Sequence, residues 1–262
     1  MISITRKQLP YQPLAYTDVG EHAYFLDAAS MQDLGVYNAD SVSASTPSGF
    51  PLFPDILSNG RLTMFIAGNP GAGKSYLAKE LISRLPEDLD VLLFTALEEN
   101  DGNFSDIKRL YKIKMEPENL KNITLSAIRA RSKHPLLLFD DVDKIRRKDV
   151  QKLVFAIMED ALANGRGHKH HDGEGDVHVI ITSHCLNDYV KTKYSLENSD
   201  YVALFPASTT YSQMKRMFDK LGLSKEECEF IMKLGKRGDF RSIIIRKVAP
   251  MYILYGNTIT LI

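Results

Sequence analysis

The chain has 262 residues, 44% hydrophobic and 25% charged, and its basic and acidic residues balance to a formal net charge of zero. This composition is typical of a globular protein with one large domain, or with a core and an appendage. A neutral chain has no overall attraction for nucleic acid or an anionic membrane, so such binding would depend on local charge. With two cysteines, no signal peptide pattern and no apolar run long enough to span a membrane, we expect a soluble intracellular protein.

The first 55 residues contain short mixed segments separated by prolines, with a serine-rich stretch over residues 41–49. Prolines and serines at this density favour loops. We therefore predict an N-terminal arm over residues 1–55 that ends in a loop near Pro54. The remaining residues, 56–262, are predicted to form one domain.

From Leu62 onward, apolar segments alternate with amphipathic helical patterns. This alternation predicts an α/β fold with a mostly parallel central sheet and covering helices. The segments are apolar almost throughout, as in strands that are buried on both faces. The predicted strands are Leu62–Ala67, Val91–Ala96, Asn122–Ser126, Leu136–Asp140 and Val177–Ser183.

A C-terminal extension is predicted from about residue 206, after the apolar segment Tyr201–Phe205. It begins with a polar helix over Ser212–Leu221. A second helix over Ser224–Leu234 starts with a capping box, in which Ser224 is followed by Glu227. The chain then ends in short strands, predicted at Ser242–Val248 and Met251–Tyr255, with Asn257–Ile262 as a candidate third.

Residues 68–75 carry the phosphate-binding pattern GxxxxGK[ST], placed between a predicted strand and a predicted helix. Glycines let the backbone N–H groups surround a phosphate, and the helix dipole adds to the anion site. Lys74 would reach the β- and γ-phosphates, and Ser75 would hold Mg²⁺. We predict that ATP and Mg²⁺ bind here. The predicted nucleotide contacts are Gly68, Asn69, Pro70, Gly71, Ala72, Gly73, Lys74, Ser75 and Tyr76.

Two adjacent carboxylates, Asp140 and Asp141, end the apolar run that starts at Leu136, which is a Walker B pattern. Phosphoryl transfer needs a bound metal ion and an oriented water, so we assign Asp140 to Mg²⁺ and Asp141 to the water. The alternative is that Asp141 or Asp143 caps a helix starting near Ile145. The second acid favours ATPases that use a catalytic carboxylate, and the lack of an Asn-Lys-x-Asp motif favours ATP over GTP.

The apolar run Val177–Ser183 leads directly into His184. We expect this strand to lie beside the Walker B strand, with its end facing the γ-phosphate. His184 is then predicted to act as a sensor that contacts the γ-phosphate or the attacking water, with Ser183 as the weaker candidate. The alternative is a purely structural histidine.

Further segments discriminate between families that share the generic phosphate loop, above all the one over 196–206, with Asn-Ser-Asp at 198–200 and Phe-Pro at 205–206. With the tail segments 213–216, 231–234 and 245–252, the chain resembles the poxvirus-type genome-packaging ATPases of the FtsK–HerA superfamily. This family occurs in large DNA viruses and virophages, and the similarity covers about residues 60–258. The resemblance implies an ASCE/RecA-like P-loop NTPase that forms a ring, a pentamer or hexamer, with ATP between subunits.

The resemblance also implies an arginine that reaches the phosphate bound by a neighbouring subunit and stabilises charge in the transition state. Arg166 matches the position where the family carries a Gly-Arg-His run, although an apparent insertion over residues 167–176 follows it. The alternative is a solvated loop charge. The competing arginines are Arg129, Arg131, Arg216 and Arg241.

The insertion holds several side chains that are able to bind a metal ion, namely His168, His170, His171 and Asp172. Their spacing lacks the regularity of a structural site, so a surface loop is the favoured interpretation.

Two basic clusters flank the Walker B strand, one over residues 129–134 and one over 144–148. Gathered around the channel of a ring, either cluster would contact DNA phosphates without reading sequence. The alternative for residues 144–148 is a solvated helix face.

The resemblance implies a motor that hydrolyses ATP and translocates double-stranded DNA into a preformed capsid. Its expected partners are DNA and capsid vertex or membrane-associated capsid proteins, without stable membrane insertion of the motor itself. Its expected location is the virus factory in the host cytoplasm, or the virion. The alternatives are an FtsK–HerA pump for segregation or conjugation, a P-loop small-molecule kinase, and an ATP-gated interaction protein; DNA-stimulated turnover would argue against the last two.

Overall fold

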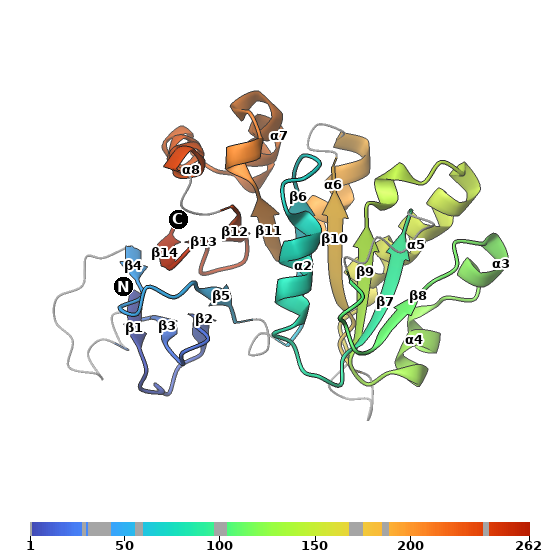
Figure 1. The fold of residues 1–262 in the computed structure, drawn as a ribbon, viewed down its shortest axis with the longest axis horizontal. Coiled ribbons are helices and arrows are strands. Elements are labelled where there is room, and N and C mark those ends of the chain that lie inside the picture. Colours follow the sequence, from blue (N-terminus) through green and yellow to red (C-terminus); the bar gives the residue numbers. More distant parts are fainter. Residues whose placement is uncertain are drawn as a thin grey trace.

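A computed structural model gives the fold of the chain (Figure 1). It describes residues 2–27, 30, 43–55, 60–96, 104–167, 175–184, 189–237 and 241–262, with the backbone alone at 189–191 and 236–237. Within these residues a ten-stranded sheet crosses the molecule in the order β4-β14-β13-β12-β11-β6-β10-β9-β7-β8. The sheet divides into a parallel half and an antiparallel half, which meet at β11.

The parallel half runs β11-β6-β10-β9-β7-β8 and confirms the predicted α/β fold. Its strands are β6 (Thr63–Ala67), β7 (Asp90–Thr95), β8 (Leu110–Lys112), β9 (Pro135–Asp140), β10 (His178–Ser183) and β11 (Tyr201–Leu204). Every residue of β6, β9 and β10 is buried, as the continuous apolar runs indicate. As expected, β10 lies beside β9, and it separates β9 from β6.

Helices cover both faces of the sheet and bury two apolar layers. They are α2 (Lys74–Ile82), α3 (Pro117–Leu120), α4 (Leu125–Arg131), α5 (Lys148–Asn164) and α6 (Tyr189–Asn198). Successive strand residues alternate between the layers: Leu137 and Phe139 pack with α5, whereas Leu136 and Leu138 pack in the layer that contains α2. The sheet is therefore held from both sides, which fixes the strand ends that form the site.

The prediction of a strand over Asn122–Ser126 is wrong. Thr124 is instead the N-cap of α4, and its Oγ1 accepts a hydrogen bond from the backbone N–H of Ala127 at 3.2 Å. A threonine side chain that satisfies a helix N-terminus outweighs the strand propensity of a short apolar run. The strand next to β7 is β8, which the sequence pattern did not reveal.

The C-terminal extension forms α7 (Tyr211–Leu221) and α8 (Lys225–Arg237), followed by the antiparallel strands β12 (Ile243–Arg246), β13 (Tyr252–Tyr255) and β14 (Thr258–Leu261). The predicted capping box is present, because Ser224 and Glu227 exchange backbone-to-side-chain hydrogen bonds of 2.6 and 3.2 Å. The candidate third strand is also confirmed.

The first 55 residues contain strands that the sequence analysis did not predict. β1 (Ile2–Thr5), β2 (Pro13–Tyr16), β3 (His22–Phe25) and β5 (Phe53–Pro54) form a small sheet in the order β1-β3-β2-β5. β4 (Ser43–Ser45) instead pairs with β14 at the edge of the large sheet, so the two ends of the sequence lie side by side (Figure 1). The hydroxyl of Tyr252 also donates to the carbonyl of Leu14 at 2.8 Å.

Arg61 is a buried structural arginine at the amino-terminal edge of the sheet. Its guanidinium donates to the carbonyls of Val177 at 2.9 Å and Leu162 at 3.2 Å, and to that of Ala161. Burial lowers the pKa of Arg61, although the nearby acids Asp200 and Asp176 oppose this shift. Arg61 thus fastens the end of α5 to the chain that enters β10.

Replacing Arg61 by methionine is expected to lower the free energy of unfolding by about 3 kcal/mol, because buried carbonyls lose their donors. Urea denaturation would measure the change, with the exposed Arg147→Met as a control expected to stay within about 0.5 kcal/mol. A loss below about 1 kcal/mol for Arg61→Met would mean that these carbonyls find other partners.

Candidate active site

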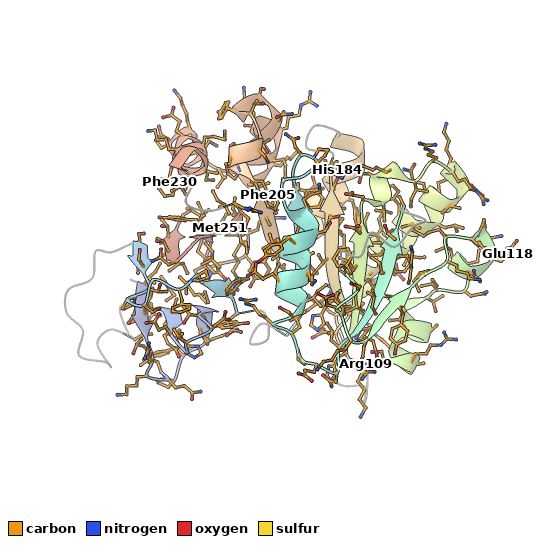
Figure 2. All side chains as sticks on the ribbon, viewed as in Figure 1. Arg109, Glu118, His184, Phe205, Phe230 and Met251 are labelled. Atoms are coloured by element: carbon orange, nitrogen blue, oxygen red, sulfur yellow. The ribbon has the colours of Figure 1, made fainter. Side chains whose placement is uncertain are left out.

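The phosphate-binding loop connects β6 to α2 and is shaped by glycines. Gly71 and Gly73 have φ angles of 76° and 106°, in the left-handed region that favours glycine. A Cβ atom on Gly68 would lie 2.8 Å from the ring of Phe205, so only glycine fits beside that buried ring. Phe205 follows β11, and the structure thus supports the loop from the neighbouring strand. Figure 2 shows Phe205 and His184 at the same edge of the sheet, near the start of α2.

Lys74 is the first residue of α2 and is 5% exposed. Its Nζ donates to the carbonyl of Gly68 at 3.1 Å and lies 2.9 Å from Nδ1 of His184. Burial lowers the pKa of Lys74, and the negative charge of Asp141 opposes this shift. The ammonium group is therefore held inside the loop, where phosphate oxygens would replace its present partners.

Asp140 ends β9 and faces the start of α2. Its Oδ1 accepts a hydrogen bond from Thr182 at 2.7 Å, and the hydroxyl of Ser75 lies 3.5 Å away. A hydroxyl and a carboxylate on two adjacent elements are the oxygen ligands that Mg²⁺ prefers, so these residues fit the metal role predicted for them. Thr182, which the sequence analysis did not select, fixes the orientation of the carboxylate.

Asp141 has a φ angle of 50°, and it is the one non-glycine residue with positive φ in the part of the chain that the structure describes. This conformation costs on the order of 1 kcal/mol and turns the side chain toward β10. There Oδ2 lies 2.5 Å from Nε2 of His184 and 3.5 Å from Nζ of Lys144.

Helix capping is not the role of the Asp141 side chain. Asp141 precedes the 3-10 turn η1 (Val142–Lys144) without a side-chain capping bond, and α5 starts at Lys148, later than the expected Ile145. The capping alternative for Asp141 is therefore not supported.

His184 links the lysine of the phosphate-binding loop to the second carboxylate. Lys74 carries only donors when charged, so Nδ1 of His184 must accept and the ring proton lies on Nε2, where it is donated to Asp141. The contacts thus define a neutral tautomer and a continuous relay of Lys74, His184 and Asp141. Sequence analysis predicted both polar ends of this relay near the γ-phosphate, but not the histidine between them.

Other predicted site residues lie elsewhere or are only peripheral. The side chain of Tyr76 is 67% exposed, and Ser183 is buried, with its carbonyl accepting from the N–H of Gly68 at 3.2 Å. Arg166 is exposed at the amino-terminal edge of the sheet, where its carbonyl accepts from Arg129 at 3.1 Å. Since β10 spans about 20 Å, Arg166 lies too far from the phosphate-binding loop to serve its own subunit.

The competing arginines are also distributed. Arg129 is bonded to the carbonyls of Asn164 and Arg166, Arg131 lines a cavity beside β8, and Arg216 lies on α7. The suggested ligands His168, His170, His171 and Asp172 are outside the described residues. Within the described residues, no group of three or more His, Cys, Asp or Glu side chains is arranged to hold a metal ion.

Comparison with known proteins identifies the family. The model of the ATPase family associated with various cellular activities (AAA) matches residues 64–193. The "Uncharacterized protein V3" of the Sputnik virophage is 30% identical over 202 residues, which cover 75% of this chain and 76% of V3. The chain belongs to the V3 family. This V3-family protein is a P-loop ATPase, and its matched residues include the phosphate-binding loop, both carboxylates and His184.

Solved structures similar to this V3-family ATPase include secretion ATPases. EccC (ATPases 2 and 3) of Thermomonospora curvata aligns with a TM-score of 0.38 and 11% identity, over 59% of this chain and 31% of that chain. EscN of enteropathogenic E. coli aligns with a TM-score of 0.38 and 14% identity, over 76% of this chain and 65% of that one. Among the described residues, no helix is both long enough and apolar enough to cross a membrane.

Proposed function

We propose that this ATPase is a genome-packaging motor that hydrolyses ATP at the subunit interfaces of a ring and moves double-stranded DNA into a preformed capsid. The observation that carries the proposal is the relay of Lys74, His184 and Asp141, together with kinship to a virophage protein. A motor must convert the presence of the γ-phosphate into a change elsewhere in the chain, and this relay joins the phosphate-binding lysine to the catalytic carboxylate.

The relay suggests how the γ-phosphate is sensed. Lys74 would give its hydrogen bonds to the phosphate oxygens, and Nδ1 of His184 would lose its donor. His184 would then be free to turn toward the phosphate or the attacking water, while Asp141 orients that water and accepts its proton. Ser75 and Asp140 would hold Mg²⁺, which neutralises charge on the phosphates.

Assembly into a ring is part of the proposal. Arg166 is exposed and lies at the sheet edge opposite the phosphate-binding loop, so its predicted role as a finger requires a neighbouring subunit. Such a motor would act in the virus factory of an infected cell and would use a capsid vertex or membrane-associated capsid protein as its anchor.

The role of Arg166 is tested by mixing subunits. Arg166→Ala and Asp141→Asn are each expected to be inactive alone, whereas co-assembled rings should regain part of the ATPase activity, since some interfaces then combine intact Arg166 with intact Asp141. Arg129→Ala mixed in the same way is the matched control. No regained activity in rings shown to contain both variants would rule out the trans role of Arg166.

The proposed function is tested by steady-state ATP hydrolysis with and without double-stranded DNA, alongside the particle mass from light scattering. We expect DNA to accelerate turnover in a ring-sized particle. Activity that follows a small-molecule acceptor and ignores DNA would instead indicate a kinase. Translocation without dependence on capsids would favour a segregation or conjugation pump.

A further inference from the structure

We propose that a basic groove beside the active site binds the phosphate backbone of DNA, and that Lys144 couples its occupancy to the catalytic carboxylate Asp141. The proposal rests on the proposed function, because it names where the DNA acts on this ATPase. The groove has a volume of about 1010 Å³. Its basic lining residues are Lys112, Lys114, Lys144, Arg146 and Arg147.

The groove lies at the same sheet edge as the active site. Its floor includes Thr95 at the carboxyl end of β7, and β7 pairs with β9, the strand that carries Asp140. One wall is the segment that follows β8, and the other is the connection from η1 to α5. Two separate segments thus place cations on opposite sides of one depression.

The charge of this lining favours a polyanion. All five basic side chains are exposed, and the described residues that line the groove include no carboxylate. Arg147 is paired with Asp149 at 2.7 Å just outside the lining. Lys114 and Arg146 make no hydrogen bond or ion pair with any residue that the structure describes, so they are available to a ligand.

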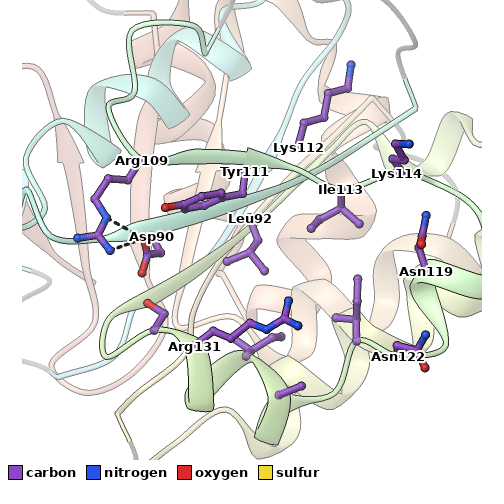
Figure 3. Close-up of a pocket in the computed structure, with 14 residues that line it drawn as sticks. Asp90, Leu92, Arg109, Tyr111, Lys112, Ile113, Lys114, Asn119, Asn122 and Arg131 are labelled. Atoms are coloured by element: carbon purple, nitrogen blue, oxygen red, sulfur yellow. Dashed lines mark hydrogen bonds and ion pairs between the residues drawn. The ribbon is translucent and has the colours of Figure 1, made fainter.

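The positive surface continues past the groove, which indicates an extended ligand and not a single phosphate. A second cavity of about 670 Å³ shares Lys112 and Lys114 and adds Arg131 from α4 (Figure 3). At the far end of this cavity, Asp90 neutralises Arg109 through contacts of 2.6 and 2.7 Å. The cations therefore form a strip of limited length, as contact with successive backbone phosphates requires.

Lys144 connects this strip to the chemistry. It lines the groove, yet its Nζ lies 3.5 Å from Oδ2 of Asp141, on the oxygen that also contacts His184. A DNA phosphate in the groove would compete with Asp141 for this ammonium group. Occupied, the groove withdraws a cation from the carboxylate and leaves Asp141 a stronger proton acceptor. Lys144 is thus a positioning residue that restrains Asp141 until DNA is bound.

The binding site is tested with Lys114→Ala/Arg146→Ala and a random-sequence DNA duplex, by fluorescence anisotropy over a range of salt concentrations. We expect about tenfold weaker binding, and a slope of log K against log salt that is about 1.8 smaller, or 0.9 for each lost contact. ATPase activity without DNA should be unchanged. The control is Lys108→Ala/Lys133→Ala, which removes two exposed lysines from the opposite sheet edge.

The coupling is tested with Lys144→Met. We expect its ATPase rate without DNA to approach the DNA-stimulated rate of the wild type, so that added DNA changes the rate by a factor near one. Wild-type stimulation in Lys144→Met would overturn the coupling, and wild-type affinity and salt slope in the double variant would overturn the groove. A wild-type protein that neither binds DNA nor responds to it would instead refute the proposed function itself.

Discussion

Asp141→Asn is expected to reduce kcat for ATP by about a thousandfold and to leave the affinity for ATP nearly unchanged. The amide keeps the shape of the side chain but does not accept a proton from the attacking water. Asparagine also tolerates the left-handed conformation that Asp141 adopts at φ 50°, so the turn after β9 should be retained. Single-turnover hydrolysis and equilibrium binding of a fluorescent ATP analogue would separate the two effects.

Asp143→Asn is the matched control for this experiment, since it makes the same change two residues further along and Asp143 does not contact His184. We expect its kcat to stay within about threefold of the wild type, a small change beside the loss from removing a catalytic base. Undiminished turnover in Asp141→Asn would refute the assignment of Asp141 and move attention to Asp140.

Lys74→Ala is expected to weaken ATP binding by at least about a hundredfold, which corresponds to about 2.7 kcal/mol and to the loss of charge-assisted bonds to phosphate. The buried ammonium group has no other described counterpart in the loop, and its partners Gly68 and His184 are not able to replace its donors. Isothermal titration with ATP and Mg²⁺ would measure the change.

Lys79→Ala provides the comparison on the same helix. Lys79 lies on α2 and pairs with Asp106 on the surface, so its removal should leave nucleotide affinity unchanged. Equal losses in the two variants would show that the effect comes from damage to α2 and not from a missing phosphate contact.

Local patterns explain most of what the sequence predicted correctly. The phosphate-binding loop is defined by consecutive residues, and the buried strands by apolar runs that need no knowledge of their neighbours. The error at Asn122–Ser126 arose because a helix cap depends on one hydroxyl, which is Thr124, and not on the pattern around it. The strands of the first 55 residues are short, and they are stabilised by partners distant in sequence, such as β14.

The geometry of the site was only partly predictable. That Asp140 and His184 meet at one edge follows from parallel strands, and the observed register pairs Thr182 with Asp140. The contact between His184 and Asp141 depends in addition on the left-handed turn at Asp141, which no pattern in the sequence reveals. The neighbour Lys144 was noted only as part of a basic cluster, because its position relative to Asp141 follows from the same turn.

The pairing of β4 with β14 has a consequence for how the protein is made. Residues 43–45 leave the ribosome long before residues 258–260, their partners at the edge of the large sheet. Closing such a long loop is entropically costly and slow, so this edge should form late in folding. Until then the edge of β14 stays unpaired, and newly made chains at high concentration are at that stage most prone to associate through it.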